Sequence, residues 1–291
     1  MIDIIEIKKV IERFKDIKDN YYDIFINYYN SLNEINDCWK TNKGLAYYNV
    51  ICNEKKLFSE FMENFDDFLQ LFLFLIDEYS KIGNKIHYDS SLENKYINLK
   101  NNLISYLKDI INIYENINLL GVEEEVSSLI ELEKNKFINY KDNIVDLCEQ
   151  NRDIIRKIDA IEKNIQVKVS KIDVVVITVT DVKDYDLEID KDFDVSVTDS
   201  EKMRNIYSKI QMYINEEDSI LRDINDVFID LSDCYKTDNL DIIEKLEAEF
   251  IININNILKI HNLNLEVLGK EIVSVEEMEK TNINNIRNII N

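Results

Sequence analysis

The sequence contains no proline and only four glycines in 291 residues. Rossmann domains, P-loop nucleotide-binding domains, β-sandwiches and propellers need these residues in their tight turns and phosphate-binding loops, so these folds are excluded. The two histidines, His87 and His261, lie far apart, and neither has a second ligand at helical metal-binding spacing. We therefore expect a protein that is not an enzyme and has no cofactor, and we expect both histidines to be ordinary surface or helix-end residues.

Long hydrophobic runs and paired cysteines are also missing. The most apolar stretch, residues 68–76, is about half as long as the roughly 18 residues that span a bilayer. The N-terminus lacks the basic region and apolar run of a cleaved signal peptide. The four cysteines show no C-x-x-C or Cys/His spacing, so we expect reduced thiols. These features predict a chain that is cytoplasmic, or secreted without a cleaved signal, and not an integral membrane protein.

Positive charge is scarce. The chain has 35 Lys and Arg against 57 Asp and Glu, which gives a net charge of −22. Such a charge argues against nucleic acid and anionic membranes as default partners. The apolar fraction of 45 % is nevertheless high enough for a packed core. A protein partner, either another helical protein or a second copy of the chain, is therefore expected, and membrane contact remains open.

What the sequence does contain is a helical pattern with apolar residues at alternating steps of three and four. Such a pattern predicts long helices that pack at shallow angles, as in coiled coils. In residues 1–40 the seam consists of Ile4, Ile7, Ile11, Phe14, Tyr21, Phe25, Tyr28, Leu32, Ile35 and Trp39. A second seam consists of Phe58, Phe61, Phe65, Phe68, Phe72, Leu75, Tyr79 and Ile82. The short connection between them predicts an antiparallel helical hairpin over residues 1–84.

The same pattern continues in the rest of the chain, with one interruption. It predicts long central helices over 92–165, interrupted at Gly121, and a C-terminal helical hairpin over 200–291. Between them, residues 166–199 change to β-branched residues with a period of two, which predicts an inserted β-hairpin. The expected fold is thus mostly α, an elongated bundle of long antiparallel coiled-coil-like helices with one inserted β-hairpin.

One pentapeptide occurs in nearly the same form twice. Residues 37–41 read Asp-Cys-Trp-Lys-Thr and residues 233–237 read Asp-Cys-Tyr-Lys-Thr, each at the end of a long predicted helix. An ancient duplication of a helical hairpin is one explanation. Composition bias together with shared helix-end chemistry is the other.

The first of these helix ends resembles the WXG100 (ESAT-6-like) hairpins of type VII secretion. The matching residues are Trp39, Gly44 and Ala46, although the strict motif would place glycine at position 41, where this chain has Thr41. The second copy has Tyr235 and no glycine. The resemblance implies export without a cleaved signal and pairing with another helical protein. The contact residues would then be Trp39, Gly44, Tyr235, Phe58, Phe61 and Phe65, unless the phenylalanines simply form the bundle core.

The order of the predicted elements is also similar to that of cytolysin A-like α-helical pore-forming toxins, which carry a β-tongue that enters the membrane. The tongue here would be residues 167–197. Its candidate membrane or partner contacts are Val174, Val175, Val176, Ile177, Tyr185 and Phe193. The acidic residues between Asp186 and Asp194 oppose this interpretation, because carboxylates in a bilayer core cost several kcal/mol each.

Those acidic residues also form a weak candidate for a cation site. Asp190, Asp192, Asp194 and Glu201 occupy four ligand positions of an EF-hand loop, but Val195 stands where the loop needs glycine. An exposed strand face that stays soluble and resists edge pairing explains the same residues. From the sequence we therefore expect a non-enzymatic protein–protein interaction protein, with a pore-forming toxin and a cytoplasmic acidic scaffold or inhibitor as alternatives.

Overall fold

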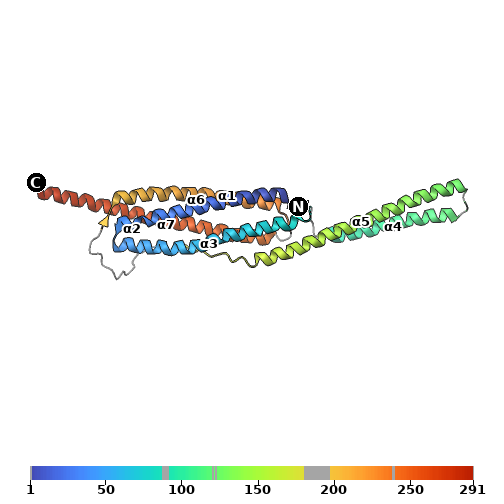
Figure 1. Cartoon of the computed structure of the whole chain (residues 1–291), viewed down its shortest axis with the longest axis horizontal. Helices are drawn as coiled ribbons and strands as arrows, with labels where there is room; N and C mark the ends of the chain where they lie inside the picture. Colours follow the sequence, from blue (N-terminus) through green and yellow to red (C-terminus); the bar gives the residue numbers. More distant parts are fainter. Residues whose placement is uncertain are drawn as a thin grey trace.

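The computed structural model describes residues 2–86, 92–119, 121, 123–179, 197–237 and 240–290. It shows an elongated, mostly α-helical molecule with a multi-helix body and a two-helix arm that projects from one end (Figure 1). The helices are α1 (Ile4–Asn33), α2 (Ile35–Cys38), α3 (Asn42–Ser80), α4 (Leu92–Leu119), α5 (Glu124–Val169), α6 (Ser200–Cys234) and α7 (Leu240–Ile290). The described residues also form four two-residue strands: β1 (Ile2–Asp3), β2 (Trp39–Lys40), β3 (Lys85–Ile86) and β4 (Val197–Thr198). The predicted helical class and antiparallel packing are confirmed.

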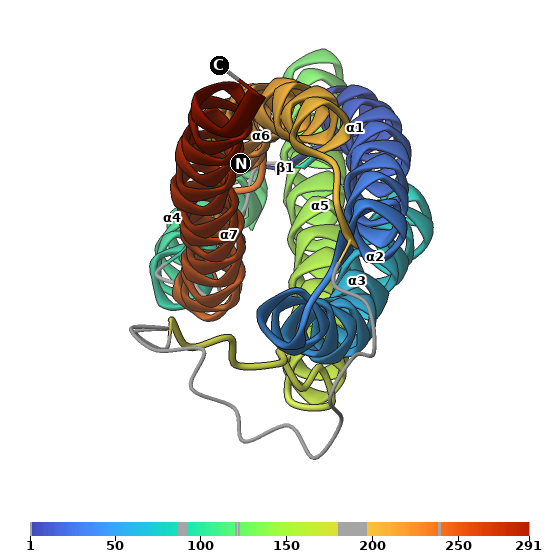
Figure 2. The same ribbon diagram turned by 90° about the vertical axis from the view of Figure 1, so that its left-hand side faces the viewer.

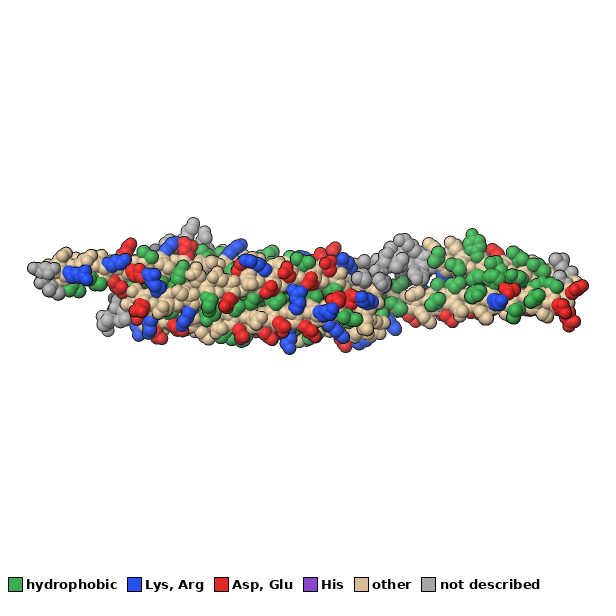
Figure 3. Space-filling view, turned by 90° about the horizontal axis from the view of Figure 1, so that it is seen from above, with side chains coloured by type: hydrophobic (Ala, Val, Ile, Leu, Met, Phe, Trp, Pro, Cys, Tyr) green, Lys and Arg blue, Asp and Glu red, His purple; other side chains and the backbone are tan. Residues whose placement is uncertain are grey.

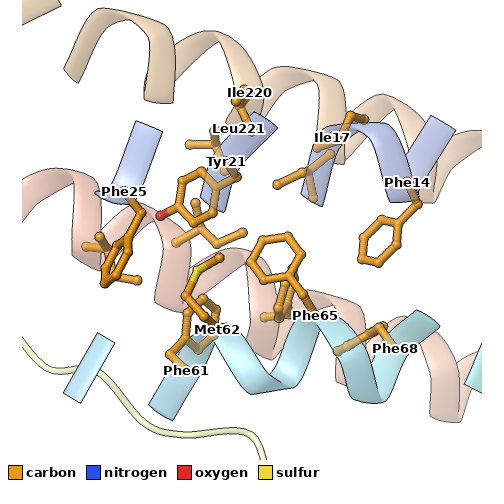
Figure 4. Close-up of a cluster of buried hydrophobic side chains, with 14 of the residues drawn as sticks. Phe14, Ile17, Tyr21, Phe25, Phe61, Met62, Phe65, Phe68, Ile220 and Leu221 are labelled. Atoms are coloured by element: carbon orange, nitrogen blue, oxygen red, sulfur yellow. The ribbon is translucent and has the colours of Figure 1, made fainter. Parts of the chain in front are cut away.

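The body core is built from the predicted seams of α1, α3, α6 and α7. All ten seam residues predicted between Ile4 and Trp39 are buried, and so is the phenylalanine seam of α3. The rings meet across the bundle: Phe65 lies 5.9 Å from Phe14 of α1 and 4.6 Å from Phe250 of α7, between ring centroids. Figure 4 shows this cluster between α1, α3 and α6. Burial of this many aromatic and aliphatic side chains is the main favourable term for the body.

The two helical hairpins of the body are equivalent at an offset of 196 residues. Asp3 caps the start of α1 by accepting hydrogen bonds from backbone amides, and Asp199 does the same for α6. At the helix ends, the thiols of Cys38 and Cys234 each donate to the carbonyl three residues earlier, at 3.5 and 3.3 Å. The repeated pentapeptide therefore marks the same structural position, the end of a helix, in both hairpins.

Short backbone pairings connect the two units reciprocally. Trp39 caps the end of α2, and Tyr235 caps the end of α6 at the equivalent position. Their backbone angles are similar (φ −126°, ψ 68° for Trp39 and φ −119°, ψ 86° for Tyr235). Trp39 pairs with Thr198, and Tyr235 forms an isolated bridge with Ile2, which is the equivalent of Thr198. A separate pairing joins β1 to β3. The two hairpins of the body are thus related by pseudo-two-fold symmetry. Helix α1 of one hairpin packs against α6 of the other (Figure 2).

The predicted β-hairpin over 166–199 is not formed by the described residues. Residues 166–169 are the last turn of α5, and residues 172–179 are extended but form no strand. The expectation of a strand from Val167 is therefore wrong. Of the apolar residues that suggested a strand, Val174 and Ile177 are buried against the body, which supplies their burial without a sheet.

Candidate interaction surface

The arm, residues 92–157 of α4 and α5, has almost no core of its own. Of its residues whose side chains the structure describes, Leu107 alone is buried, at 8 % exposure. Farther along α5, Ile158, Ile161 and Ile165 are buried where the helix reaches the body. Two antiparallel helices have only one surface to share, so their remaining apolar side chains stay in solvent.

Helix α4 carries two adjacent apolar seams. The inner seam is Ile104, Leu107, Ile111 and Tyr114, and it faces α5, since the Tyr114 ring stacks on Phe137 at 5.8 Å. An ion pair of 3.1 Å between Lys134 and Glu115 fixes the same register. The outer seam, rotated about 100° away on the helix, is Leu99, Leu103, Tyr106, Ile110, Ile113 and Ile117. Its spacing of four, three, four, three, four is that of a helix with a second packing partner.

Helix α5 carries a matching outer set. Val126, Tyr140, Leu147 and Ile154 recur at multiples of seven residues, and Leu129 lies beside them. All five are exposed, with Leu129 at 63 % and Leu147 at 57 %. Heptad spacing is the pattern of a packing seam, yet no helix lies against this one among the described residues.

The two outer sets lie on one face of the arm. On α4 each exposed outer residue directly precedes a more buried one, as Leu103 precedes Ile104. The same holds on α5, where Leu147 precedes Cys148 and Ile154 precedes Ile155. Both outer sets are therefore turned from the more buried side in the same sense when each helix is viewed from its own N-terminus. Because α4 and α5 are antiparallel, equal turns bring both sets to the same side. Figure 3 shows hydrophobic side chains gathered along the arm, whereas charged side chains cover much of the body. We name the eleven residues of these two sets the arm face.

The arm is also the least acidic part of the molecule. Residues 92–157 have nine Lys and Arg and twelve Asp and Glu, a net charge of −3, so the other residues carry −19 of the total −22. At the base of the arm a cleft of about 290 Å³ opens between α4 and α5, lined by Ile97, Lys100, Cys148 and Ile155 among others. An exposed apolar face with little net charge is typical of an association site.

The residues predicted as partner contacts from the hairpin pattern lie inside the body. The side chains of Trp39, Tyr235, Phe58, Phe61 and Phe65 are at most 1 % exposed. Gly44 is buried beneath Trp39, where a Cβ atom would lie 2.1 Å from the Trp39 carbonyl oxygen. These residues close the end of a hairpin or fill the core, the alternative that the sequence left open for the phenylalanines.

The first half of the predicted tongue is bound to the body. Val174 and Ile177 are buried, Val175 is partly buried and Val176 is 75 % exposed. The Ile177 amide donates to Oδ1 of Asn253 at 2.7 Å, and its carbonyl accepts from Asn256 at 2.8 Å.

Asn64 of α3 holds the same segment from the other side. Its Oδ1 accepts from the Val175 amide at 3.0 Å, and its Nδ2 donates to the Asp173 carbonyl at 3.0 Å. The side-chain amides of α3 and α7 thus replace a partner strand, and the segment fills the groove between these two helices.

Several predicted residues lie outside the described part of the chain. Tyr185, Phe193, Asp190, Asp192 and Asp194 fall in residues 180–196. Glu201 is described, and it lies exposed in the first turn of α6. Within the described residues, no group of three or more His, Cys, Asp or Glu side chains is placed to hold a metal ion.

The prediction for His261 is wrong, because this residue is 1 % exposed in the centre of the body. Its Nδ1 lies 2.7 Å from Glu217 Oε2, and its ring stacks on Tyr28 at 3.8 Å. The other oxygen of Glu217 accepts from the hydroxyl of Tyr21 at 2.8 Å. In the sequence, Glu217 is a polar residue at apolar-seam spacing in residues 200–234, but no local pattern shows that His261 of another helix lies beside it.

A second buried carboxyl lies where α5 meets the body. Glu162 is 6 % exposed and accepts hydrogen bonds from the hydroxyls of Tyr79, Tyr235 and Thr237. Burial raises the pKa of the Tyr235 hydroxyl, and the negative charge of Glu162 adds to the shift. In both clusters the two oxygens of the buried carboxyl group are hydrogen-bonded within the protein, which is typical of a structural role.

No protein-family model, curated protein or solved structure matches this chain. Among the helices that the structure describes, none has an apolar stretch of the length that a bilayer requires. What the protein does must therefore be inferred from its own surface.

Proposed function

We propose that this chain is a non-enzymatic protein–protein interaction protein and that the arm face is its contact surface. One observation carries the proposal: nine of the eleven outer apolar residues of α4 and α5 are exposed on the same side of a projecting hairpin, and the other two, Ile110 and Ile117, are partly buried. A contiguous apolar surface of this kind is costly in water unless a partner covers it.

The charge distribution supports the same function. The acidic body keeps the molecule in solution and repels other acidic surfaces, whereas the nearly neutral arm presents its apolar face at a distance from that charge. A type VII export substrate, its targeting partner and an intracellular acidic scaffold would each use such a surface. The resemblance to WXG100 hairpins at Trp39 and Gly44 favours the exported form.

A pore-forming function is the second candidate, because an exposed apolar helical face also suits a bilayer surface. It is less well supported. Membrane-surface helices carry lysine and arginine on their polar side, whereas the arm has a slight excess of acidic residues. In addition, a tongue would have to leave the hydrogen bonds that Asn64, Asn253 and Asn256 make to residues 173–177.

Site-specific photo-crosslinking in cells that produce the chain tests the proposal. A benzophenone amino acid replaces Tyr106, which is 72 % exposed on the arm face, or Ile229, which is 61 % exposed on the body. We expect defined protein adducts from position 106 and none from position 229. Leu147→Glu on the arm face should suppress the adducts, and Ile252→Glu on the body should leave them unchanged.

The opposite results would contradict an interaction role for the arm. These are equal labelling from both positions, or adducts that survive Leu147→Glu. Leakage of dye from vesicles treated with the purified chain, abolished by Leu147→Glu, would instead favour the pore-forming alternative.

A further inference from the structure

We infer that the arm face binds a second copy of the same chain, so that two arms pack face to face as a four-helix bundle. This inference rests on the proposed function and names the partner of its contact surface. Three properties of the described arm support it: the arrangement of its seams, its charge and its size.

The seam arrangement is that of one half of a four-helix bundle. In such a bundle each helix contacts two neighbours, so it needs an apolar arc wider than a single heptad seam. Helix α4 has this wider arc, with Leu107 turned to α5 and Leu103 and Tyr106 turned outward. The arm supplies two helices with outer seams on the same side, and a second arm supplies the other two. A face that is complementary to itself produces a closed dimer with two-fold symmetry.

The charge of the arm suits a copy of itself better than a partner of opposite charge. Helix α4 has three acidic and three basic residues, and the whole arm has a net charge of −3. Two arms therefore repel each other weakly, while the strongly acidic bodies can remain apart at the far ends of the elongated molecules. A surface selected for a basic protein would carry the excess of carboxylates that the body has and the arm lacks.

The size of the face matches a stable dimer. The 28 residues of α4 form a helix about 42 Å long at 1.5 Å per residue. The arm face spans 19 residues of α4 and 29 residues of α5, about 28 and 43 Å, and each helix is about 10 Å wide, so the face covers roughly 700 Å² on each copy. That area is the usual contribution of one partner to a stable protein–protein interface.

Sedimentation velocity of the purified full chain tests the inference. We expect the wild type to sediment as a dimer of about 69 kDa, twice the chain mass of 34.6 kDa, and to dissociate on dilution. The double variant Tyr106→Glu/Leu147→Glu should raise the dimer dissociation constant by roughly 100-fold or more, because it buries four carboxylates in the interface. Both side chains are exposed in the single chain, so circular dichroism should show unchanged helix content.

The matched control is Ile229→Glu/Ile252→Glu, which adds the same charge at two exposed apolar positions of the body. This variant should remain dimeric. A wild type that stays monomeric at all concentrations overturns the inference, as does equal dissociation of both double variants or of neither.

Two further outcomes separate this inference from the proposed function. If the wild type is monomeric while position 106 crosslinks to a different protein in cells, the interaction function stands and the second copy is excluded. If monomeric chains bind zwitterionic vesicles through the arm face, the partner is a membrane. A second copy of the chain and a different protein are then both excluded.

Discussion

At the scale of single residues, the effect of a buried carboxyl group on stability depends on whether it is hydrogen-bonded. Glu217 and Glu162 each receive hydrogen bonds from neighbouring side chains. Glu247 of α7 differs: it is 5 % exposed, and its Oε1 has no hydrogen-bond partner. Burial raises the pKa of Glu247 to about 8, and the nearby charge of Glu244 contributes to the shift.

We predict that Glu247→Gln stabilises the protein at alkaline pH. A folded-state pKa of about 8, above the ordinary 4.5, means that the folded state holds its proton more tightly than the unfolded chain does. The resulting stability is fully present below about pH 4.5 and is lost as the pH rises through about 8. The stability of the variant relative to wild type should therefore rise by roughly 2–4 kcal/mol between about pH 5.5 and about pH 9.

Urea denaturation at a series of pH values measures this difference. Glu249→Gln, which removes the same charge from an exposed position on the same helix, is the control and should not reproduce the change with pH. Parallel pH curves for wild type and Glu247→Gln would show that the carboxyl is ionised in the fold.

At the scale of elements, the turn between α2 and α3 explains the clearest sequence motif. Thr41 caps α3 by accepting a hydrogen bond from the Gly44 amide at 3.0 Å, and Trp39 lies over the same turn with 1 % exposure. The absence of a side chain at Gly44 permits this contact. A Cβ atom there would lie 2.1 Å from the carbonyl oxygen of Trp39 and 2.8 Å from its Cγ.

We predict that Gly44→Ala destabilises the protein by roughly 1–3 kcal/mol or more, because backbone and indole must both move to admit the methyl group. The same substitution usually stabilises a helix. Gly83→Ala is the control, since nothing lies within 4 Å of its added Cβ and its φ angle is not positive. It should be neutral or stabilising by up to about 1 kcal/mol. Denaturant unfolding measures the free energy of unfolding of both variants. Equal stabilities would contradict the close packing of Trp39 on Gly44.

The elements also show where the sequence pattern was sufficient and where it was not. Apolar spacing predicted both the helices of the body and their buried side chains, since each seam there packs against another helix of the same chain. The run of β-branched residues at 174–177 predicted a strand. Instead, the side chains of Asn64 in α3 and of Asn253 and Asn256 in α7 hydrogen-bond to this segment, which stays extended without a partner strand. These asparagines lie more than 70 residues away along the chain, so no local pattern could reveal them.

At the scale of the whole molecule, the body and the arm differ in how well they are packed. The body has a continuous aromatic core, whereas the described side chains of residues 94–157 include one buried residue, Leu107. Local opening requires less free energy where fewer apolar contacts must be broken. The arm is therefore the region that a partner bound to the arm face would stabilise most.

We predict that the backbone amides of the arm exchange hydrogen with solvent at least tenfold faster than those of α1 and α6 when the chain is dilute. At concentrations where the dimer forms, exchange in the arm should slow, and exchange in the body should not change. Hydrogen–deuterium exchange followed by mass spectrometry measures both regions in one sample. Equal protection of arm and body under dilute conditions would contradict the packing difference.

The sequence by itself determined the helical class, the positions of the long helices, the break at Gly121 and the residues of the body core. These features follow from the local apolar periodicity and from the absence of proline, and each of these determines structure within a few turns of helix. Only the tertiary structure decided which seams are covered. It buried His261, bound residues 173–177 to α3 and α7, and left most of the arm face exposed, because burial depends on which distant helices lie opposite each seam.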